Sequence, residues 1–316
     1  MIKLASSQSV ALLLLVAAAP VLAHEGRPHS YADAMRYWGA DPLTMAGLTI
    51  SAIFYTVGLY RIWSTTAVGK GIRRWEAAVF GIGWLSLFVA LVSPVHALSS
   101  VLFSVHMTQH EILMLVSAPL MVLGRPVVAF LWAMPVRPRE TIADISRNPT
   151  VRSAWRKISN PMAAWLIHMV ALWIWHLPVL YEAAVGNQYI HFLQHFSFFG
   201  SALLFWWALI YGRQGLLGYG AAVLYVFSTA AHSGLLGALL TFAGVVVYPT
   251  YAETAPAFGV TALEDQQLGG LIMWIPAGVL YTIAGLALLA GWLREAESMA
   301  VREMAKRSRL VEVKNG

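Results

Sequence analysis

Two pairs of histidines in this chain share one spelling, and their spacing could hold a metal ion. The sequences are His106-Met107-Thr108-Gln109-His110 and His191-Phe192-Leu193-Gln194-His195. In a helix, residues four apart point about 40° from each other and lie one turn apart along the axis. Each pair therefore presents two imidazoles on one helix face, an arrangement that suits a transition metal or a heme iron.

The composition indicates a membrane protein rather than a soluble enzyme. Of the 316 residues, 59% are hydrophobic and only 11% are charged. The apolar residues fall in blocks of roughly 20, the length that an α-helix needs to cross a bilayer core of ~30 Å. The chain contains no cysteine. Structural disulfides are therefore excluded, and any metal must be held by imidazole, carboxylate, amide or thioether groups.

The helices that must position the histidines are predicted to form an all-α bundle of seven transmembrane helices, as in a polytopic membrane protein. Residues 1–23 resemble a secretory signal peptide, with an uncleaved first helix as the alternative. Residues 24–42 are the outer N-terminal segment, residues 43–293 the transmembrane domain, and residues 294–316 a basic tail. The predicted spans are residues 43–61, 75–94, 101–123, 161–177, 189–211, 219–245 and 269–293.

The basic residues orient this bundle. If residue 24 lies outside, the inner segments together with Arg61 hold 18 of the 21 Lys and Arg, whereas the outer loops between spans hold none. This is the positive-inside distribution. It predicts a multi-pass protein of the bacterial inner membrane, with a periplasmic mature N-terminus and a cytoplasmic C-terminus. The net charge of +6 then reflects orientation, and no nucleic-acid partner is expected. Within the inner segment 124–160, residues 126–136 are apolar but too short to span, and we expect an interfacial or partly re-entrant piece.

This topology places both histidine pairs at one depth. Residues 101–123 and 189–211 both enter from outside, so the pairs lie in their first turns, with His176 at the outer end of another span. Polar residues inside a membrane are costly and usually mark a ligand site or a pathway. A short repeat, in which an outer turn with a histidine precedes each His-x-x-Gln-His sequence, would bring the four paired histidines together. The deeper His168 is better interpreted as a hydrogen-bonded packing residue.

Five features of the chain recur in one order and spacing. They are His106-Met107-x-x-His110, Trp175-His176-Leu177-Pro178 followed by Tyr181, His191-x-x-x-His195, His232 and residues 265–274 (DQQLGGLIMW). Taken together, these residues resemble the multi-spanning CtaG family of cytochrome c oxidase assembly proteins. The likeness covers roughly residues 45–293, and it implies a seven-span protein that supports maturation of a heme–copper oxidase by handling copper. The implied partners are an oxidase subunit or its assembly factors, besides the lipid bilayer.

We therefore expect a copper-binding assembly factor without enzymatic turnover. Neutral imidazole and thioether groups suit Cu(I), and His106, His110, His191 and His195 are the predicted ligands, with Met107 or His176 nearby. Asp265 is expected to orient a ligand imidazole by accepting its second N–H. Two alternatives stay open: a heme-binding electron carrier with bis-histidine ligation, and a copper transporter. No Gly-rich phosphate loop, nucleophile elbow, CxxC or HExxH sequence indicates an enzyme.

The charge bias makes the topology testable by reporter fusions. Fusions at Gly69 and at the C-terminus should report a cytoplasmic location, and fusions at Gln188 and Glu253 an outer one, because Lys and Arg resist translocation. A cytoplasmic report at Glu253 would contradict both the orientation and the depth assigned to the histidines.

Overall fold

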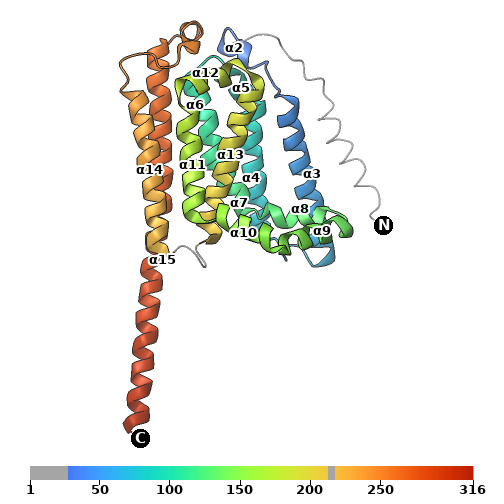
Figure 1. Ribbon diagram of the computed structural model, residues 1–316, viewed down its shortest axis with the longest axis vertical. Coiled ribbons are helices and arrows are strands. Elements are labelled where there is room, and N and C mark those ends of the chain that lie inside the picture. Colours follow the sequence, from blue (N-terminus) through green and yellow to red (C-terminus); the bar gives the residue numbers. More distant parts are fainter. Residues whose placement is uncertain (1–27, 213–217, 316) are drawn as a thin grey trace.

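The computed structural model describes residues 28–212 and 218–315, and the regular elements in these residues are all helices (Figure 1). The long helices run side by side, while three short helices lie across the lower end of the bundle in Figure 1. The predicted signal peptide, residues 1–23, lies outside the described residues. The elements are α2 (Tyr31–Ala34), α3 (Pro42–Thr65), α4 (Arg74–Val92), α5 (Pro94–Ser99), α6 (Phe103–Glu111), a π-helical segment (Ile112–Ser117), α7 (Ala118–Leu123), α8 (Pro126–Ala133), α9 (Val136–Arg147), α10 (Pro149–Ile158), α11 (Pro161–Trp175), α12 (Pro178–Gly186), α13 (Gln188–Tyr211), α14 (Tyr219–Thr241), two short 3₁₀ turns (Pro249–Tyr251 and Ala255–Phe258) and α15 (Ala262–Asn315).

The all-α, multi-pass architecture predicted from the sequence is confirmed. Five helices, α3, α4, α13, α14 and α15, are long and apolar enough to cross a membrane. Two further candidates are bent pairs: Phe103–Leu123 with α8, at 61°, and α10 with α11, at 59°. The predicted number of seven spans is reached if each bent pair crosses once.

Two helix ends differ from the predicted spans. The sixth long helix ends at Thr241 rather than residue 245, and the last helix begins at Ala262 rather than residue 269. Gly269 and Gly270 do not begin this helix; they lie inside it, where their bare Cα atoms allow neighbouring segments to approach. Helix α15 continues through the predicted basic tail to Asn315. The inner segment 124–160 forms α8, α9 and α10, and its short apolar piece is α8, which packs against α3.

Several helices begin at a polar residue followed by proline. In each case the polar side chain accepts a hydrogen bond from a backbone N–H of the first turn, and the proline occupies the first helical position, where its missing N–H costs nothing. The cap therefore fixes where the helix starts, including α5 beside the histidine sequences and α11 at the basic end of the bundle. The caps are Asp41 for α3, Ser93 for α5, Asn148 for α10 and Asn160 for α11.

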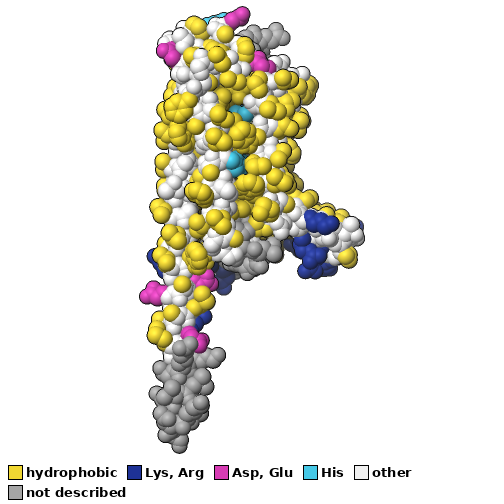
Figure 2. Space-filling model, turned by 60° about the vertical axis from the view of Figure 1, so that its left-hand side comes forward, with side chains coloured by type: hydrophobic (Ala, Val, Ile, Leu, Met, Phe, Trp, Pro, Cys, Tyr) yellow, Lys and Arg dark blue, Asp and Glu magenta, His cyan; other side chains and the backbone are white. Residues whose placement is uncertain are grey.

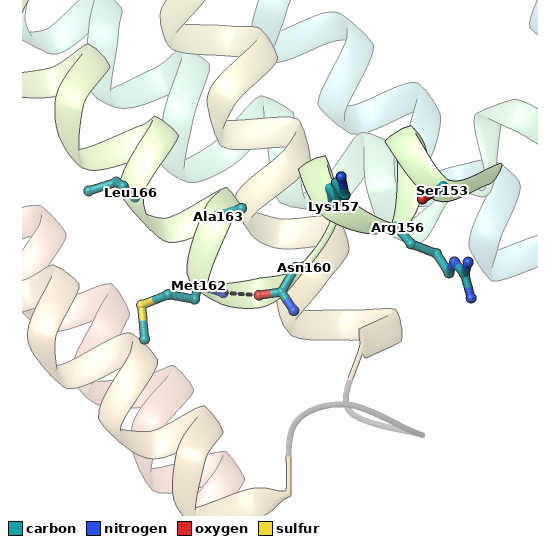
Figure 3. Close-up of a pocket in the computed structure, with 7 residues that line it drawn as sticks. All are labelled: Ser153, Arg156, Lys157, Asn160, Met162, Ala163 and Leu166. Carbon is teal, nitrogen blue, oxygen red and sulfur yellow. Dashed lines mark hydrogen bonds between the residues drawn. The ribbon is translucent and has the colours of Figure 1, made fainter. Parts of the chain in front are cut away.

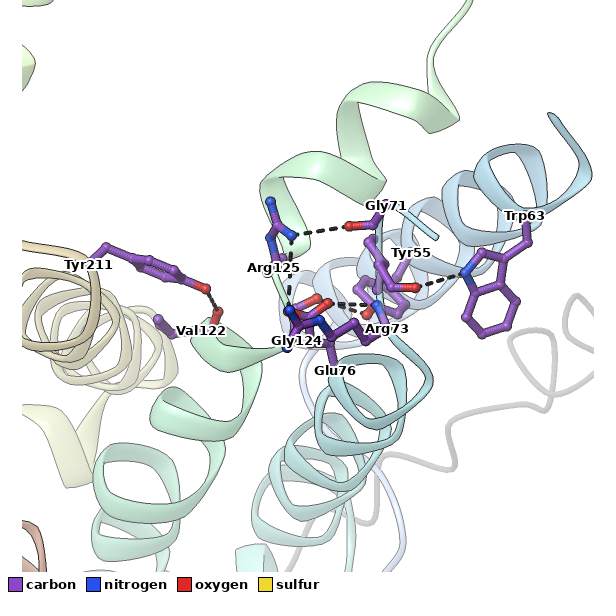
Figure 4. Close-up of polar contacts among 10 residues, drawn as sticks. Tyr55, Trp63, Gly71, Arg73, Glu76, Val122, Gly124, Arg125 and Tyr211 are labelled. Carbon is purple, nitrogen blue, oxygen red and sulfur yellow. Dashed lines mark hydrogen bonds and ion pairs between the residues drawn. The ribbon is translucent and has the colours of Figure 1, made fainter. Parts of the chain in front are cut away.

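Polar contacts hold the sharp bend between α7 and α8 (Figure 4). Arg125 adopts a left-handed backbone conformation with φ of 54°, which is unfavourable for a side chain of this size. Its guanidinium donates to the carbonyl of Gly71 at 3.1 Å and lies 4.0 Å from the carboxylate of Glu76. The Tyr55 hydroxyl donates to the carbonyl of Gly124 at 2.8 Å. These contacts offset the backbone strain and fix where α8 leaves the bundle.

Helices α14 and α15 meet through glycines. A Cβ on Gly237 would lie 2.8 Å from the carbonyl oxygen of Gly270, and a Cβ on Gly270 would lie 2.6 Å from the backbone nitrogen of Thr241. Small residues let membrane helices approach until their backbones touch, which increases van der Waals contact. This close contact fixes α15 against α14, and α15 in turn packs against α6.

The glycine contact can be tested with a matched pair of substitutions in α15. Gly270→Ala should lower the free energy of unfolding by about 1–3 kcal/mol, as overpacking does in other cores. Gly278→Ala should leave it unchanged or raise it slightly, because nothing lies within 4 Å of a Cβ there. The measurement is thermal or denaturant unfolding of the protein in detergent. Equal stability of the two variants would show that the backbones are not in contact at Gly270.

Candidate metal centre

The two histidine pairs lie side by side at one end of the bundle. His106 and His110 come from α6, and His191 and His195 come from the first two turns of α13. Ring centroids are 4.4 Å apart within the first pair and 4.1 Å apart within the second. Between pairs, His106 lies 5.2 Å from His191, and His110 lies 5.2 Å from His195. The structure thus brings the four paired imidazoles together. Each pair lies in the first turns of its helix, because α6 begins at Phe103 and α13 begins at Gln188.

Three of these imidazoles can reach one ion. Ligand nitrogens of His106, His191 and His195 all lie within 4.8 Å of one another. The Nε2 atoms of His191 and His195 are buried and have no hydrogen-bond partner. Buried polar atoms in native structures almost always have a partner, and an orphaned one calls for an explanation such as an ion. The donor chemistry therefore fits a transition metal held by neutral imidazoles.

The contacts at Nδ1 of His106 leave the lone pair of this imidazole on Nε2. Its Nδ1 lies 3.2 Å from the backbone carbonyl of Ser99 and 3.1 Å from the hydroxyl of Tyr251. Because a carbonyl only accepts, Nδ1 carries the proton and Nε2 keeps its lone pair. Metal-binding histidines generally donate their second ring N–H in this way, which fixes the tautomer and the ring orientation.

Two buried tyrosines support this contact. The Tyr251 hydroxyl also donates to the Ser99 carbonyl at 3.3 Å, and it lies 2.8 Å from the hydroxyl of Tyr181. Burial raises the pKa of Tyr181 well above its usual value, so its hydroxyl stays protonated at neutral pH. Tyr251 lies in the segment between α14 and α15, and nothing in the sequence pattern pointed to it. A tyrosine that contacts an imidazole from a distant loop gives no signal in a search for metal-ligand spacing.

His110 lies beside the three-histidine group rather than in it. Its Nε2 is 3.0 Å from Nε2 of His106, while its Nδ1 is buried without a partner. Since His106 Nε2 carries no proton, His110 Nε2 donates to it. His110 thus holds the His106 lone pair in the absence of a metal. The ring nitrogens of His106, His191 and His195 converge, and His110 is their neighbour.

A π-helical segment follows the first pair directly. It runs from Ile112 to Ser117, and Pro119 lies just beyond it. Proline lacks an N–H and its ring clashes with the carbonyl four residues earlier, so the helix widens before it. The indole of Trp206 donates to the carbonyl of Met114 at 2.9 Å and stabilises the widened turn. The irregularity fixes the rotation of α6 relative to α7, and therefore the direction in which the histidines face.

Asp265 does not contact an imidazole, contrary to the sequence-based expectation. Its carboxylate accepts hydrogen bonds from the backbone N–H groups of Phe103 and Ser104, at 2.6 and 3.2 Å, and from the Ser104 hydroxyl. It therefore caps α6 from across the bundle, where a negative charge stabilises the positive end of the helix dipole. The role that we predicted for Asp265 belongs to the Ser99 carbonyl.

Met107 and His176, the two expected neighbours of the ligands, are placed differently. The Met107 side chain is fully buried and packs toward Gly269 of α15. Helix geometry explains this, because consecutive residues point about 100° apart. His176 lies at the edge of the group, with its ring 6.0 Å from Phe198. Its Nδ1 lies 2.6 Å from the carbonyl of Leu172, and its buried Nε2 has no partner.

His96 is a site residue that the predicted ligand set left out. Its ring stacks on His191 at a centroid distance of 5.8 Å, and its Nδ1 accepts from the Gln109 amide at 3.1 Å. Burial lowers the pKa of His96, with Asp41 acting in the opposite direction. His96 lines a cavity of about 570 Å³ together with Asp41, His191 and His195. This cavity, bounded by α3, α5 and α13, connects the histidine group to the outer surface of the protein.

The remaining membrane histidines lie elsewhere. His168 pairs its Nδ1 with the Ser201 hydroxyl at 3.0 Å, as a packing residue would. The ring of His232 packs at 5.6 Å against Trp165. Neither belongs to the group of three that could share an ion among the described residues.

Comparison with known proteins places the chain in a family. Residues 53–295 match the family described as cytochrome c oxidase caa3 assembly factor (Caa3_CtaG). An uncharacterized protein of Mycobacterium bovis is 27% identical over 291 residues, which cover 88% of this chain and 42% of that protein. An uncharacterized protein of Mycobacterium leprae is 27% identical over 280 residues, covering 84% and 41%. The chain thus spans about two fifths of the length of these relatives.

No solved structure matches the chain. The family match extends from α3 to residue 295 within α15 and includes both histidine pairs, and it confirms the resemblance drawn from the sequence. Because the match covers most of the chain, the protein belongs to the Caa3_CtaG family of cytochrome c oxidase assembly factors.

Proposed function

We propose that the protein assists the assembly of a cytochrome c oxidase by binding a copper ion as cargo at His106, His191 and His195. The observation that carries the proposal is the convergence of these three ligand nitrogens, with the Nε2 atoms of His191 and His195 otherwise unpartnered. Family membership supplies the link to the oxidase.

The chemistry of the ligand set supports copper. Neutral imidazole nitrogens bind copper well, and hard cations such as Mg²⁺ and Ca²⁺ prefer oxygen ligands instead. Asp265 is occupied at the start of α6 and supplies no oxygen to this group. Three ligands leave a coordination position free. A cargo ion needs such a position, because a receiving ligand must bind before the ion can leave.

The cavity beside the group supports a cargo role as well. It reaches His191 and His195 from the outer surface and is lined by His96 and Asp41. An ion can therefore reach or leave the imidazoles without crossing the apolar interior. The predicted depth of the group, on the side where the oxidase copper resides, agrees with this route.

The packing of the imidazoles disfavours the heme alternative. Centroid distances among His106, His110, His191 and His195 lie between 4.1 and 6.2 Å. A porphyrin would need a flat slot wider than the rings themselves between its two axial histidines. The neighbouring cavity is lined by His191 and His195 but not by His106 or His110.

Copper content of purified variants tests the site. His191→Ala and His195→Ala should each weaken copper binding by more than about 100-fold, beyond the 10- to 100-fold loss typical for a residue that merely supports a ligand. His168→Ala removes a histidine of similar burial from the same bundle and should retain copper. Metal analysis after dialysis against a weak chelator gives the result, with thermal unfolding as the control for folding. Equal copper content in all three variants would refute the site.

Oxidase assembly in cells tests the role. Deletion should lower the amount of active cytochrome c oxidase, and the His168→Ala gene should restore it, whereas the His106→Ala gene should not. Membrane levels of the variants, measured by immunoblot, exclude poor expression as the cause. Full oxidase activity with His106→Ala would show that assembly does not need the proposed ligand. Normal oxidase activity in the deletion strain would refute the assembly role itself.

A further inference from the structure

A groove lies where α10 meets α11, at the end of the bundle that carries the basic residues (Figure 3). The two helices meet at an angle of 59°, and the groove has a volume of about 560 Å³. Figure 3 shows Arg156 and Lys157 on one side of the corner, and Met162 and Leu166 on the other. The lining residues are Ser153, Arg156, Lys157, Asn160, Met162, Ala163 and Leu166.

One half of the groove carries positive charge that the protein does not neutralise. Helix α10 contains Arg152, Arg156 and Lys157 and no acidic residue. None of the three forms an ion pair with another residue that the structure describes, although Arg147 of the neighbouring α9 pairs with Asp144 at 3.0 Å. Figure 2 shows Lys and Arg gathered at this lower end, below a largely apolar bundle surface. The groove therefore offers two free cations to an anionic ligand.

The other half of the groove is apolar and belongs to a membrane-spanning stretch. Met162 and Leu166 are 70% and 48% exposed, on the first two turns of α11. The pair α10 and α11 qualifies as one bent span. Exposed apolar side chains at the start of a span contact lipid acyl chains, so the corner lies at the level of the lipid headgroups.

The corner is held in place by contacts of its own. The Trp155 ring of α10 packs edge-on against Trp207 of α13, with centroids 5.4 Å apart. The side chain of Asn160 accepts a hydrogen bond from the backbone N–H of Met162 at 3.0 Å. These contacts fix α10 relative to the bundle, so Arg156 and Lys157 keep their position beside Met162 and Leu166.

We propose that this corner binds an anionic phospholipid. The phosphodiester lies against Arg156 and Lys157, and one acyl chain lies along Met162 and Leu166. A lipid uses both halves of the groove, whereas a free anion would leave the apolar half without a role. Basic pockets beside membrane helices on the cytoplasmic side bind anionic headgroups by the same combination of contacts. The site is separate from the histidine group and does not depend on the proposed copper function.

The test compares two double variants of the full chain in detergent. Arg156→Gln with Lys157→Gln removes both cations of the groove. Arg137→Gln with Arg152→Gln removes the same charge from α9 and α10 outside the groove. Binding of a phosphatidylglycerol is followed by native mass spectrometry or by the increase in melting temperature on lipid addition. The groove variant should bind roughly 30-fold more weakly, the loss expected for two cations near an anionic surface, while the control variant should lose much less.

Three further arms complete the test. Phosphatidylcholine, which has no net charge, should not reproduce the effect, and inorganic phosphate alone should not either. Leu166→Asn should weaken phosphatidylglycerol binding without changing the charge. Equal losses in both double variants would show a general surface effect and overturn the site. An equal increase in melting temperature with inorganic phosphate would refute lipid binding and indicate a site for small anions instead.

Discussion

The contact between the Asp265 carboxylate and the first turn of α6 fixes the positions of the histidines in the candidate metal centre. A buried carboxylate is tolerated only when hydrogen bonds satisfy it, and here the donors come from Phe103 and Ser104, at the start of the helix that carries His106. The Phe103 ring also packs over the bare Cα of Gly269, one turn further along α15. Together, the cap and the ring set the height of α6 against α15. The imidazoles of α6 then meet those of α13 at one level because both helices begin at the same end of the bundle.

Inside a membrane protein, the hydrogen bonding of a histidine helps to distinguish a packing residue from a ligand. In the apolar part of the bundle water cannot satisfy a free ring nitrogen, so each nitrogen needs a partner in the protein or in a ligand. His168 finds one in Ser201 and is part of the packing. His191 and His195, which a cavity reaches, each keep an Nε2 without a partner. His232 also has no partner on either ring nitrogen. An unsatisfied imidazole therefore indicates binding only where several ligand nitrogens converge, as those of His106, His191 and His195 do.

Periodicity and charge allowed much of this arrangement to be predicted. The spacing of His106 and His110, and of His191 and His195, fixes each pair on one helix face, and the distribution of Lys and Arg predicts the same end of the bundle for both pairs. The packing partner of Met107 could not be predicted, because helical spacing gives angles within a helix and not the identity of the neighbouring helix. The partner of Asp265 is 162 residues away in the chain, and no local pattern records such a contact. The sharp bend at Arg125 could not be predicted for a related reason. A left-handed backbone conformation at a residue other than glycine is stable only through tertiary contacts, here those of Arg125 to Gly71 and Glu76.

The ligand set contains no sulfur. The chain has no cysteine, and its one methionine beside the pair, Met107, packs toward α15. Thiolates that bind copper can be oxidised to sulfenic acid or closed into a disulfide, and thioethers can be oxidised to sulfoxide. Imidazole undergoes none of these reactions. A centre built from His106, His191 and His195 therefore keeps its donor atoms in an oxidising medium and needs no reducing partner to regenerate them.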